Sequence, residues 1–139
     1  MSPKYTQETV KLENLILDSN NPRFAELYSG STEEEELINY LLYNEAAEDI
    51  AKGILKAKEF YEDRPLWVVK EGEKYIVKDG NRRCSAVKAL QFPNKYGLSL
   101  KKMVFKDLPI LVYHNEKDLN ERIFQEHTSS LFRKWDRIA

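Results

Sequence analysis

The chain has 139 residues, of which 42% are hydrophobic and 32% are charged, and its formal net charge is -1. This length fits one domain that folds without a disulfide or metal, and the near-neutral charge excludes a global attraction to nucleic acid or membrane. Cys84 is the single cysteine, and no apolar run is long enough to span a bilayer. We therefore expect a cytoplasmic protein with no membrane partner.

The predicted elements alternate between strands and helices along the chain. A short strand running into a loop is expected within 9–17, followed by a turn-rich segment over 18–31. Helices are expected over 31–43 and 45–60, because capping residues or acidic residues typical of a helix N-terminus occur at the start of these segments. The remaining elements are strands over 65–69 and 74–78 joined as a hairpin, a helix over 81–92, a strand over 107–114 and a helix from 116. This order predicts an α/β or α+β domain with a small mixed sheet flanked by helices.

The apolar residues of the predicted helices recur on one face of each helix, which is typical of helices that pack on a sheet. The acidic run 33–36 is typical of a solvated first turn that complements the helix dipole. Cys84 is expected to be a small buried hydrophobe and not a nucleophile. The expected core stripes are Leu37, Leu41 and Leu42 in the first helix, Ile50, Ile54 and Leu55 in the second, and Cys84, Val87 and Leu90 in the third.

The C-terminal residues remain amphipathic up to the last position. Leu131, Phe132, Trp135 and Ile138 are apolar, and neither a capping glycine nor a polar tail follows them. We therefore expect residues 1–139 to form a single domain that is part of a longer protein.

The stretch Tyr75–Leu90, YIVKDGNRRCSAVKAL, joins a predicted strand directly to a predicted helix. Gly80 permits a tight turn and a close backbone approach by a ligand, and Asn81 is a favoured N-cap residue. The first turn of a helix has free N–H groups and a partial positive charge, which suit an anion. Arg82 and Arg83 lie in this same turn, where the helix dipole disfavours cations.

The two arginines are stabilised if they bind an anion, most simply a phosphate. Each charge-assisted hydrogen bond contributes roughly 1.5–3 kcal/mol, against about 0.3–1 kcal/mol for the unfavourable interaction with the dipole. The alternative is a structural role, in which Asp79 or a glutamate elsewhere pairs with Arg82 and Arg83. The local residues leave both interpretations open.

The segments LILDSNNPRF, PLWVV, YIVKDGNRRCSAVKAL and LPILVY occur in the order seen in the ParB/sulfiredoxin superfamily, which the chain resembles from about Leu12 to Trp135. The resemblance implies a ParB/sulfiredoxin-like fold, with residues 1–139 as the N-terminal domain of a longer protein. Its specific motifs are Asn-Pro-Arg at 21–23 and Gly-Asn-Arg-Arg at 80–83, the form found in a broad group of bacterial ParB-like proteins. ParB-type domains typically have Gly-Glu-Arg-Arg, which cradles the phosphates of a nucleoside triphosphate, CTP in chromosome-partition proteins.

The resemblance assigns site residues to this chain. Asn81 replaces the glutamate of the ParB motif. A third ParB motif, roughly Glu-Asn-x-Gln-Arg, falls on ERIFQEHTSS, where Glu121 or Glu126 could stand for the acid, Gln125 for the glutamine and His127 for a polar contact. The phosphate-binding residues implied by the resemblance are Arg23, Asp79, Gly80, Asn81, Arg82 and Arg83.

The leading hypothesis is a nucleotide-binding switch. CTP or ATP, with Mg²⁺, would bind at the junction and control DNA binding or self-association, such as homodimer formation, through a region beyond this chain. A second hypothesis is an enzyme that uses the same pocket, such as a kinase, a nucleotide hydrolase or a nuclease, although no metal-binding cluster is evident in the sequence. The third is direct binding of the arginines to the DNA backbone without a nucleotide. Sulfiredoxin activity is not expected, because Asn81 occupies the position of the sulfiredoxin cysteine.

Overall fold

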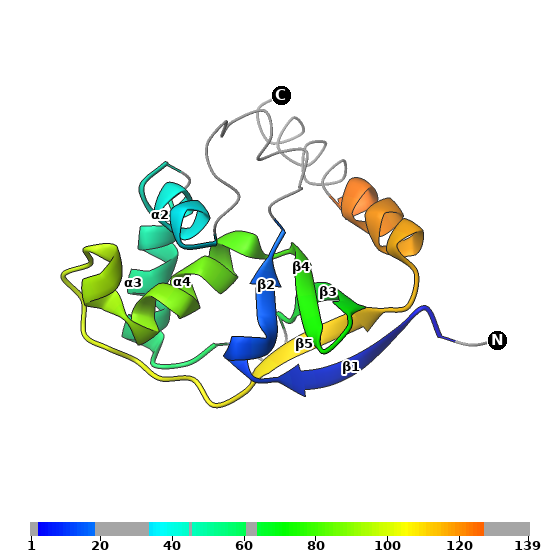
Figure 1. The fold of residues 1–139 in the computed structure, drawn as a ribbon, viewed down its shortest axis with the longest axis horizontal. Helices are drawn as coiled ribbons and strands as arrows, with labels where there is room; N and C mark the ends of the chain where they lie inside the picture. The colour runs from blue at the N-terminus through cyan, green and yellow to red at the C-terminus, as the bar shows by residue number, and fades with distance from the viewer. Residues whose placement is uncertain (1–2, 19–33, 45, 61–63, 127–139) are drawn as a thin grey trace, which may run out of the picture.

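The computed structural model describes residues 3–18, 34–44, 46–60 and 64–126. They form a five-stranded sheet in the order β1-β5-β3-β4-β2, with helices on both sides of it (Figure 1). Within these ranges, no helix has the length and apolar character needed to cross a lipid bilayer. The elements are β1 (Tyr5–Val10), η1 (Leu12–Asn14), β2 (Leu15–Leu17), α2 (Glu34–Asn44), α3 (Ala47–Ala57), β3 (Leu66–Glu71), β4 (Lys74–Asp79), α4 (Asn81–Gln91), η2 (Pro93–Tyr96), β5 (Leu108–Tyr113) and a helix over 116–126.

The sheet is mixed, because two strand pairs are parallel and two are antiparallel. β2 pairs with β4, and β3 with β5, in parallel. β1 pairs with β5, and β3 with β4, in antiparallel orientation. The β3–β4 hairpin turns at Gly72, whose φ of 64° is in the left-handed region that favours glycine. The predicted α+β fold with a small mixed sheet is confirmed.

The segment 9–17, predicted as one strand running into a loop, contributes to two strands at opposite edges of the sheet. β1 ends at Val10, η1 turns the chain, and β2 begins at Leu15. The one-strand prediction was wrong because most side chains of β1 are exposed. Without a buried face, β1 lacks the alternation of apolar and polar residues that identifies a half-buried strand.

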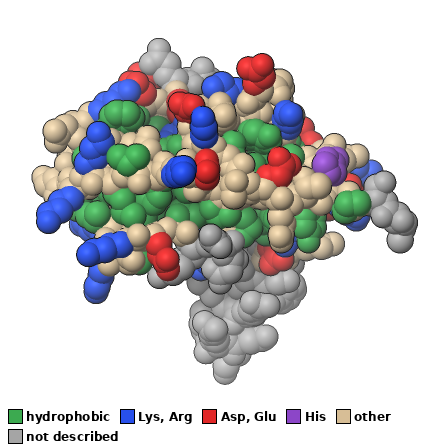
Figure 2. All heavy atoms as spheres, turned by 90° about the horizontal axis from the view of Figure 1, so that it is seen from below, with side chains coloured by type: hydrophobic (Ala, Val, Ile, Leu, Met, Phe, Trp, Pro, Cys, Tyr) green, Lys and Arg blue, Asp and Glu red, His purple; other side chains and the backbone are tan. Residues whose placement is uncertain are grey.

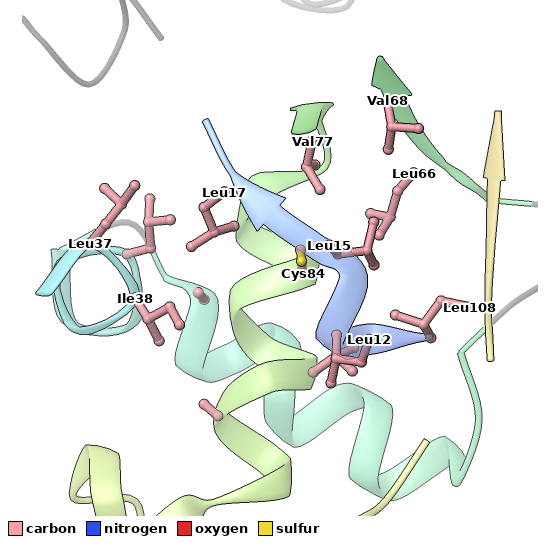
Figure 3. Close-up of a cluster of buried hydrophobic side chains, with 14 of the residues drawn as sticks. Leu12, Leu15, Leu17, Leu37, Ile38, Leu66, Val68, Val77, Cys84 and Leu108 are labelled. Carbon is pink, nitrogen blue, oxygen red and sulfur yellow. The ribbon is translucent and has the colours of Figure 1, made fainter. Parts of the chain in front are cut away.

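The main core lies between the sheet and helices α2 to α4 (Figure 3). Leu66, Val68 and Val77 enter it from neighbouring strands, and Leu15 and Leu17 enter it from β2. The predicted stripes of α2 and α4 are confirmed, since Leu37, Leu41, Leu42, Cys84, Val87 and Leu90 are all buried.

The predicted stripe of α3 packs against the core but is only partly buried. The fully buried residues of α3 are Ala47 and Ala51, and Ala51 packs in a cluster with Ala86 and Leu90 of α4. Small side chains at this contact let the two helix backbones approach each other closely. The larger residues Ile50, Ile54 and Leu55 are only partly buried around the cluster.

The opposite face of the sheet is covered by the helix over 116–126. Leu119 from this helix is buried against Leu111 and Tyr113 of β5. Arg122 donates a hydrogen bond of 2.6 Å to the Tyr113 hydroxyl, and its guanidinium lies 4.2 Å from the centre of the Trp67 ring. The sheet therefore has a second, smaller core on this face.

Candidate functional site

The carboxyl ends of β2 and β4 meet at one edge of the sheet, where α4 begins (Figure 1). The two strands are parallel, with Leu17 opposite Val77. Gly80 alone separates the end of β4 from the first residue of α4. In open α/β sheets, ligands bind outside the carboxyl ends of parallel strands, and β2 and β4 form such a parallel pair, so this junction is the candidate functional site.

Gly80 is required at the junction for two reasons. Its φ of 100° lies in the left-handed region, and a Cβ atom added here would lie 2.5 Å from Cδ2 of Leu66. Gly80 is also the N-cap of α4, and no side chain makes a cap hydrogen bond there. The expectation that Asn81 caps the helix was therefore wrong, because Asn81 is the first helical residue.

Asn81 ties the ends of the two parallel strands together. Its side chain is buried, with 6% of the residue exposed. Nδ2 donates to the Val77 carbonyl at 2.9 Å, and Oδ1 accepts from the backbone N–H of Asp18 at 3.2 Å. Both polar atoms of the amide are used inside the protein, so this side chain fixes the shape of the junction.

The two arginines occupy different environments. Arg82 is exposed, whereas Arg83 is half-buried. The Arg83 guanidinium donates to the carbonyls of Arg64 and Pro65 and lies 5.7 Å from the centre of the Phe60 ring. Arg83 thus fastens the segment before β3 to the start of α4, and Arg82 presents its charge to solvent.

Asp79 is half-buried beside this pair. Burial lowers the pKa of Arg83, and the nearby Asp79 carboxylate opposes that shift. This interaction of Asp79 with Arg83 fits the structural alternative that the sequence left open, in which Asp79 pairs with an arginine of the junction.

A lysine that the sequence analysis did not select connects the junction to the C-terminal helix. Nζ of Lys78 lies 3.2 Å from Oδ2 of Asp18 and 2.8 Å from Oε1 of Glu116. Burial on its own would lower the pKa of Lys78, but the hydrogen bonds and charges of Glu116 and Asp18 raise it. The sequence signal was a charged residue inside a strand immediately before the junction.

Asp18, Lys78 and Glu116 line part of a cavity of about 770 Å³ on the face of the sheet opposite the main core. Val69 and Ile76 contribute apolar walls, and the lining also includes residues from the 116–126 helix. The cavity therefore adjoins the candidate site through Asp18 and Lys78.

A second ion pair supports the site from the side of the main core. Lys88 of α4 contacts Glu34 of α2 and donates to the Leu15 carbonyl at 2.6 Å. Glu34 also accepts from the backbone N–H of Leu17 at 3.1 Å. The expectation of a fully solvated first turn over 33–36 was wrong for Glu34, because its carboxylate pairs with Lys88 and accepts a hydrogen bond from the β2 backbone.

Other predicted site residues are distributed as follows. Arg23 and His127 lie outside the described residues. Gln125 and Glu126 are exposed near the end of the 116–126 helix, and Gln125 lines a shallow cavity built only from residues of that helix. Their predicted contact with a ligand stays a prediction. In the part of the chain that the structure describes, no three His, Cys, Asp or Glu side chains form a group that could hold a metal ion.

Solved structures similar to this chain include two pNOB8-like ParB N-domains and a sulfiredoxin. The ParB structures are 21% and 24% identical, with TM-scores of 0.45 and 0.43, and cover 87% and 83% of this chain. The chain spans only 35% and 30% of those two chains. Sulfiredoxin from Arabidopsis thaliana is 13% identical, with a TM-score of 0.41, 85% of this chain covered and 97% of its own.

The likeness concerns the fold. No family model matches the chain, and neither does any curated protein. The function proposed below rests on the residues of this chain.

Proposed function

We propose that this chain is a ParB-like domain that binds the phosphates of a nucleoside triphosphate, CTP or ATP, at the junction between β4 and α4. The observation that carries the proposal is the exposed Arg82 in the first turn of α4, at the carboxyl ends of two parallel strands. Gly80 turns the chain from β4 into α4, and α4 has no acidic residue in its first turn.

The electrostatics of the helix start favour an anionic ligand. The partial positive charge of the helix terminus and the Arg82 guanidinium repel each other by about 0.3–1 kcal/mol. A phosphate oxygen that accepts from Arg82 gains roughly 1.5–3 kcal/mol and also interacts with the backbone N–H groups of the first turn. Because Arg83 is engaged with backbone carbonyls, its expected part is to hold the turn in place.

Mg²⁺ would reach this site with the triphosphate. Mg²⁺ in nucleotide sites is commonly held by phosphates and one or two carboxylates. Asp79, which precedes Gly80, is the carboxylate that fits this part, and the metal would neutralise charge on the phosphates. Because the described residues contain no group of three His, Cys, Asp or Glu side chains that could hold a metal, the phosphates themselves would supply most of the Mg²⁺ ligands other than water.

Lys78 provides a route by which binding could act as a switch. Asn81 at the start of α4 holds the backbone of Asp18, Asp18 pairs with Lys78, and Lys78 pairs with Glu116 at the start of the 116–126 helix. A ligand that shifts the junction therefore acts on the position of that helix. In a longer protein, the helix would relay this change to a region that binds DNA or a second copy of the chain.

The test is isothermal calorimetry with CTP, ATP, GTP and ADP, each with and without Mg²⁺. We expect one triphosphate to bind the native chain and Arg82→Ala to lose that binding while keeping the native circular dichroism spectrum. Lys74→Ala, at an exposed position in the β3–β4 hairpin, is the matched control and should bind normally. Absence of binding by all four nucleotides, or full binding by Arg82→Ala, would reject the proposal.

A further inference from the structure

The segment that follows α4 is strongly basic in an otherwise acidic chain. Residues 92–106 contain four lysines and no acidic residue. Because the whole chain has a net charge of -1, the remainder has a net charge of -5 (-1 minus +4). All four lysines, Lys95, Lys101, Lys102 and Lys106, are exposed. Figure 2 shows basic side chains gathered toward one end of the molecule, the end where Figure 1 places η2 and α3.

An aromatic ring is exposed among these lysines. Phe92 is 54% exposed, and it directly follows the last residue of α4. The ammonium of Lys95 lies 6.0 Å from the ring centre, and that of Lys102 lies 5.8 Å from it. Phe92 therefore offers a partly exposed apolar ring with two positive charges near it.

A second exposed ring lies close by. Tyr43 of α2 is 51% exposed, and its hydroxyl donates to the Tyr96 carbonyl. The Tyr96 ring in turn has the Lys95 ammonium at 5.8 Å. Lys95 also pairs with Glu35, which is an acidic neighbour of this surface. Lys95 therefore lies beside aromatic residues where η2 meets the end of α2.

The backbone beneath these side chains is firmly held. The N–H of Leu98 donates to the Pro93 carbonyl at 2.9 Å, and the N–H of Met103 donates to the Leu90 carbonyl at 2.9 Å. Pro93 and Leu98 are buried, and Met103 packs against the cluster of Ala51, Ala86 and Leu90. The segment that carries Phe92 and the lysines is therefore anchored to the core at Pro93, Leu98 and Met103.

We propose that this lysine–aromatic surface, defined as Tyr43, Phe92, Lys95, Lys101, Lys102 and Lys106, binds single-stranded nucleic acid. Unpaired bases stack on exposed aromatic rings. Lys95 and Lys102 beside the Phe92 ring, with Lys101 and Lys106 of the same segment, would contact the phosphates of the strand. Paired bases inside a duplex cannot reach the rings, which is why the surface selects single strands. It is separate from the nucleotide site, because α4 begins near Arg82 and ends before Phe92, about 15 Å away along the helix axis.

The experiment measures fluorescence anisotropy of a labelled oligo-dT at several salt concentrations, with the native chain and two triple variants. Lys101→Ala/Lys102→Ala/Lys106→Ala should reduce the slope of log affinity against log salt by about 2, at roughly 0.7 for each lysine. The control Lys11→Ala/Lys70→Ala/Lys117→Ala has the same net charge and removes exposed lysines elsewhere. Its slope should equal that of the native chain.

Three further variants test stacking and the nucleotide site separately from charge. Phe92→Ala should bind the oligonucleotide roughly tenfold more weakly, and Phe92→Trp should restore binding. Arg82→Ala should keep oligonucleotide binding whatever its effect on nucleotides. The proposal is overturned if the two triple variants behave alike, if Phe92→Ala binds normally, if a matched duplex binds as tightly as the single strand, or if the native chain binds only vesicles of anionic lipid.

Discussion

Residues of the same type serve different purposes at the β4–α4 junction. Arg82 and Arg83 are adjacent in the sequence, yet one is exposed and the other binds two backbone carbonyls beside the Phe60 ring. Asn81, which the sequence suggested as a cap, is instead a buried link between two strands. The role of each of these residues depends on the direction in which its side chain projects from α4.

This difference predicts opposite effects of two alanine substitutions. Arg83→Ala removes hydrogen bonds to two carbonyls and should lower the free energy of unfolding by about 1–3 kcal/mol. Arg82→Ala removes an exposed side chain and should change it by less than about 0.5 kcal/mol. Urea denaturation followed by circular dichroism measures both. Equal losses of stability would contradict the structural role of Arg83.

Cys84 predicts a pH dependence of stability. Burial raises the pKa of its thiol from 9.0 to about 12. Between these pH values the native state keeps the proton and the unfolded state releases it, so the free energy of unfolding falls as pH rises above 9.0. Urea denaturation across this range measures the fall, and Cys84→Ala should show a smaller one. Identical pH profiles for the two proteins would contradict a buried thiol.

At the scale of elements, the junction depends on a glycine that holds a strand and a helix in close contact. Gly80 has a positive φ and no room for a Cβ atom beside Leu66. Gly53, within α3, has neither constraint, since no atom lies within 4 Å of a Cβ added there. Glycine is therefore required at position 80, whereas at position 53 it lowers the stability of the helix.

Alanine substitutions at the two glycines should have opposite signs. Gly80→Ala should lower the free energy of unfolding by about 1–3 kcal/mol, through backbone strain and the clash with Leu66. Gly53→Ala should raise it by about 0.5–1 kcal/mol, because alanine is the better helix former. Thermal or urea unfolding of both variants checks the pair. Stabilisation by Gly80→Ala would show that the turn can relax at no cost.

At the scale of the whole molecule, the sheet is stabilised by two cores of unequal size. Helices α2 to α4 cover one face, and the 116–126 helix covers part of the other through Leu119, Arg122 and Ile123. This second core connects the C-terminal helix to the sheet beside the cavity that adjoins the junction. The position of the helix therefore matters both for stability and for the proposed switch.

The second core can be tested from within one helix. Leu119 is fully buried, whereas Phe124 is 73% exposed. Leu119→Ala should lower the free energy of unfolding by about 2–4 kcal/mol, because it leaves a cavity, and Phe124→Ala should change it by less than about 0.5 kcal/mol. Urea denaturation followed by tryptophan fluorescence is the measurement. A small effect of Leu119→Ala would mean that the helix contributes little to folding.

Much of the fold could be predicted from local sequence. The α+β class, the β3–β4 hairpin, the core stripes of α2 and α4 and the strand–glycine–helix junction follow from periodicity and turn chemistry, which act over a few residues. The motif at 80–83 also indicated the junction that is the candidate site. Its phosphate-binding role and that of Arg23 stay predictions, as does the polar contact of His127.

Tertiary structure alone decided which distant residues meet. The sequence by itself determined that a strand hands over to a helix at Gly80. It did not determine that Asp18 lies between Asn81 and Lys78, that Glu34 pairs with Lys88, or that β1 and β2 occupy opposite edges of the sheet. These contacts join residues far apart along the chain, and they depend on strand order and register, which local propensities do not encode. For the same reason, the structural role of Arg83 could not be predicted, because its partners in the segment before β3 are distant in the sequence.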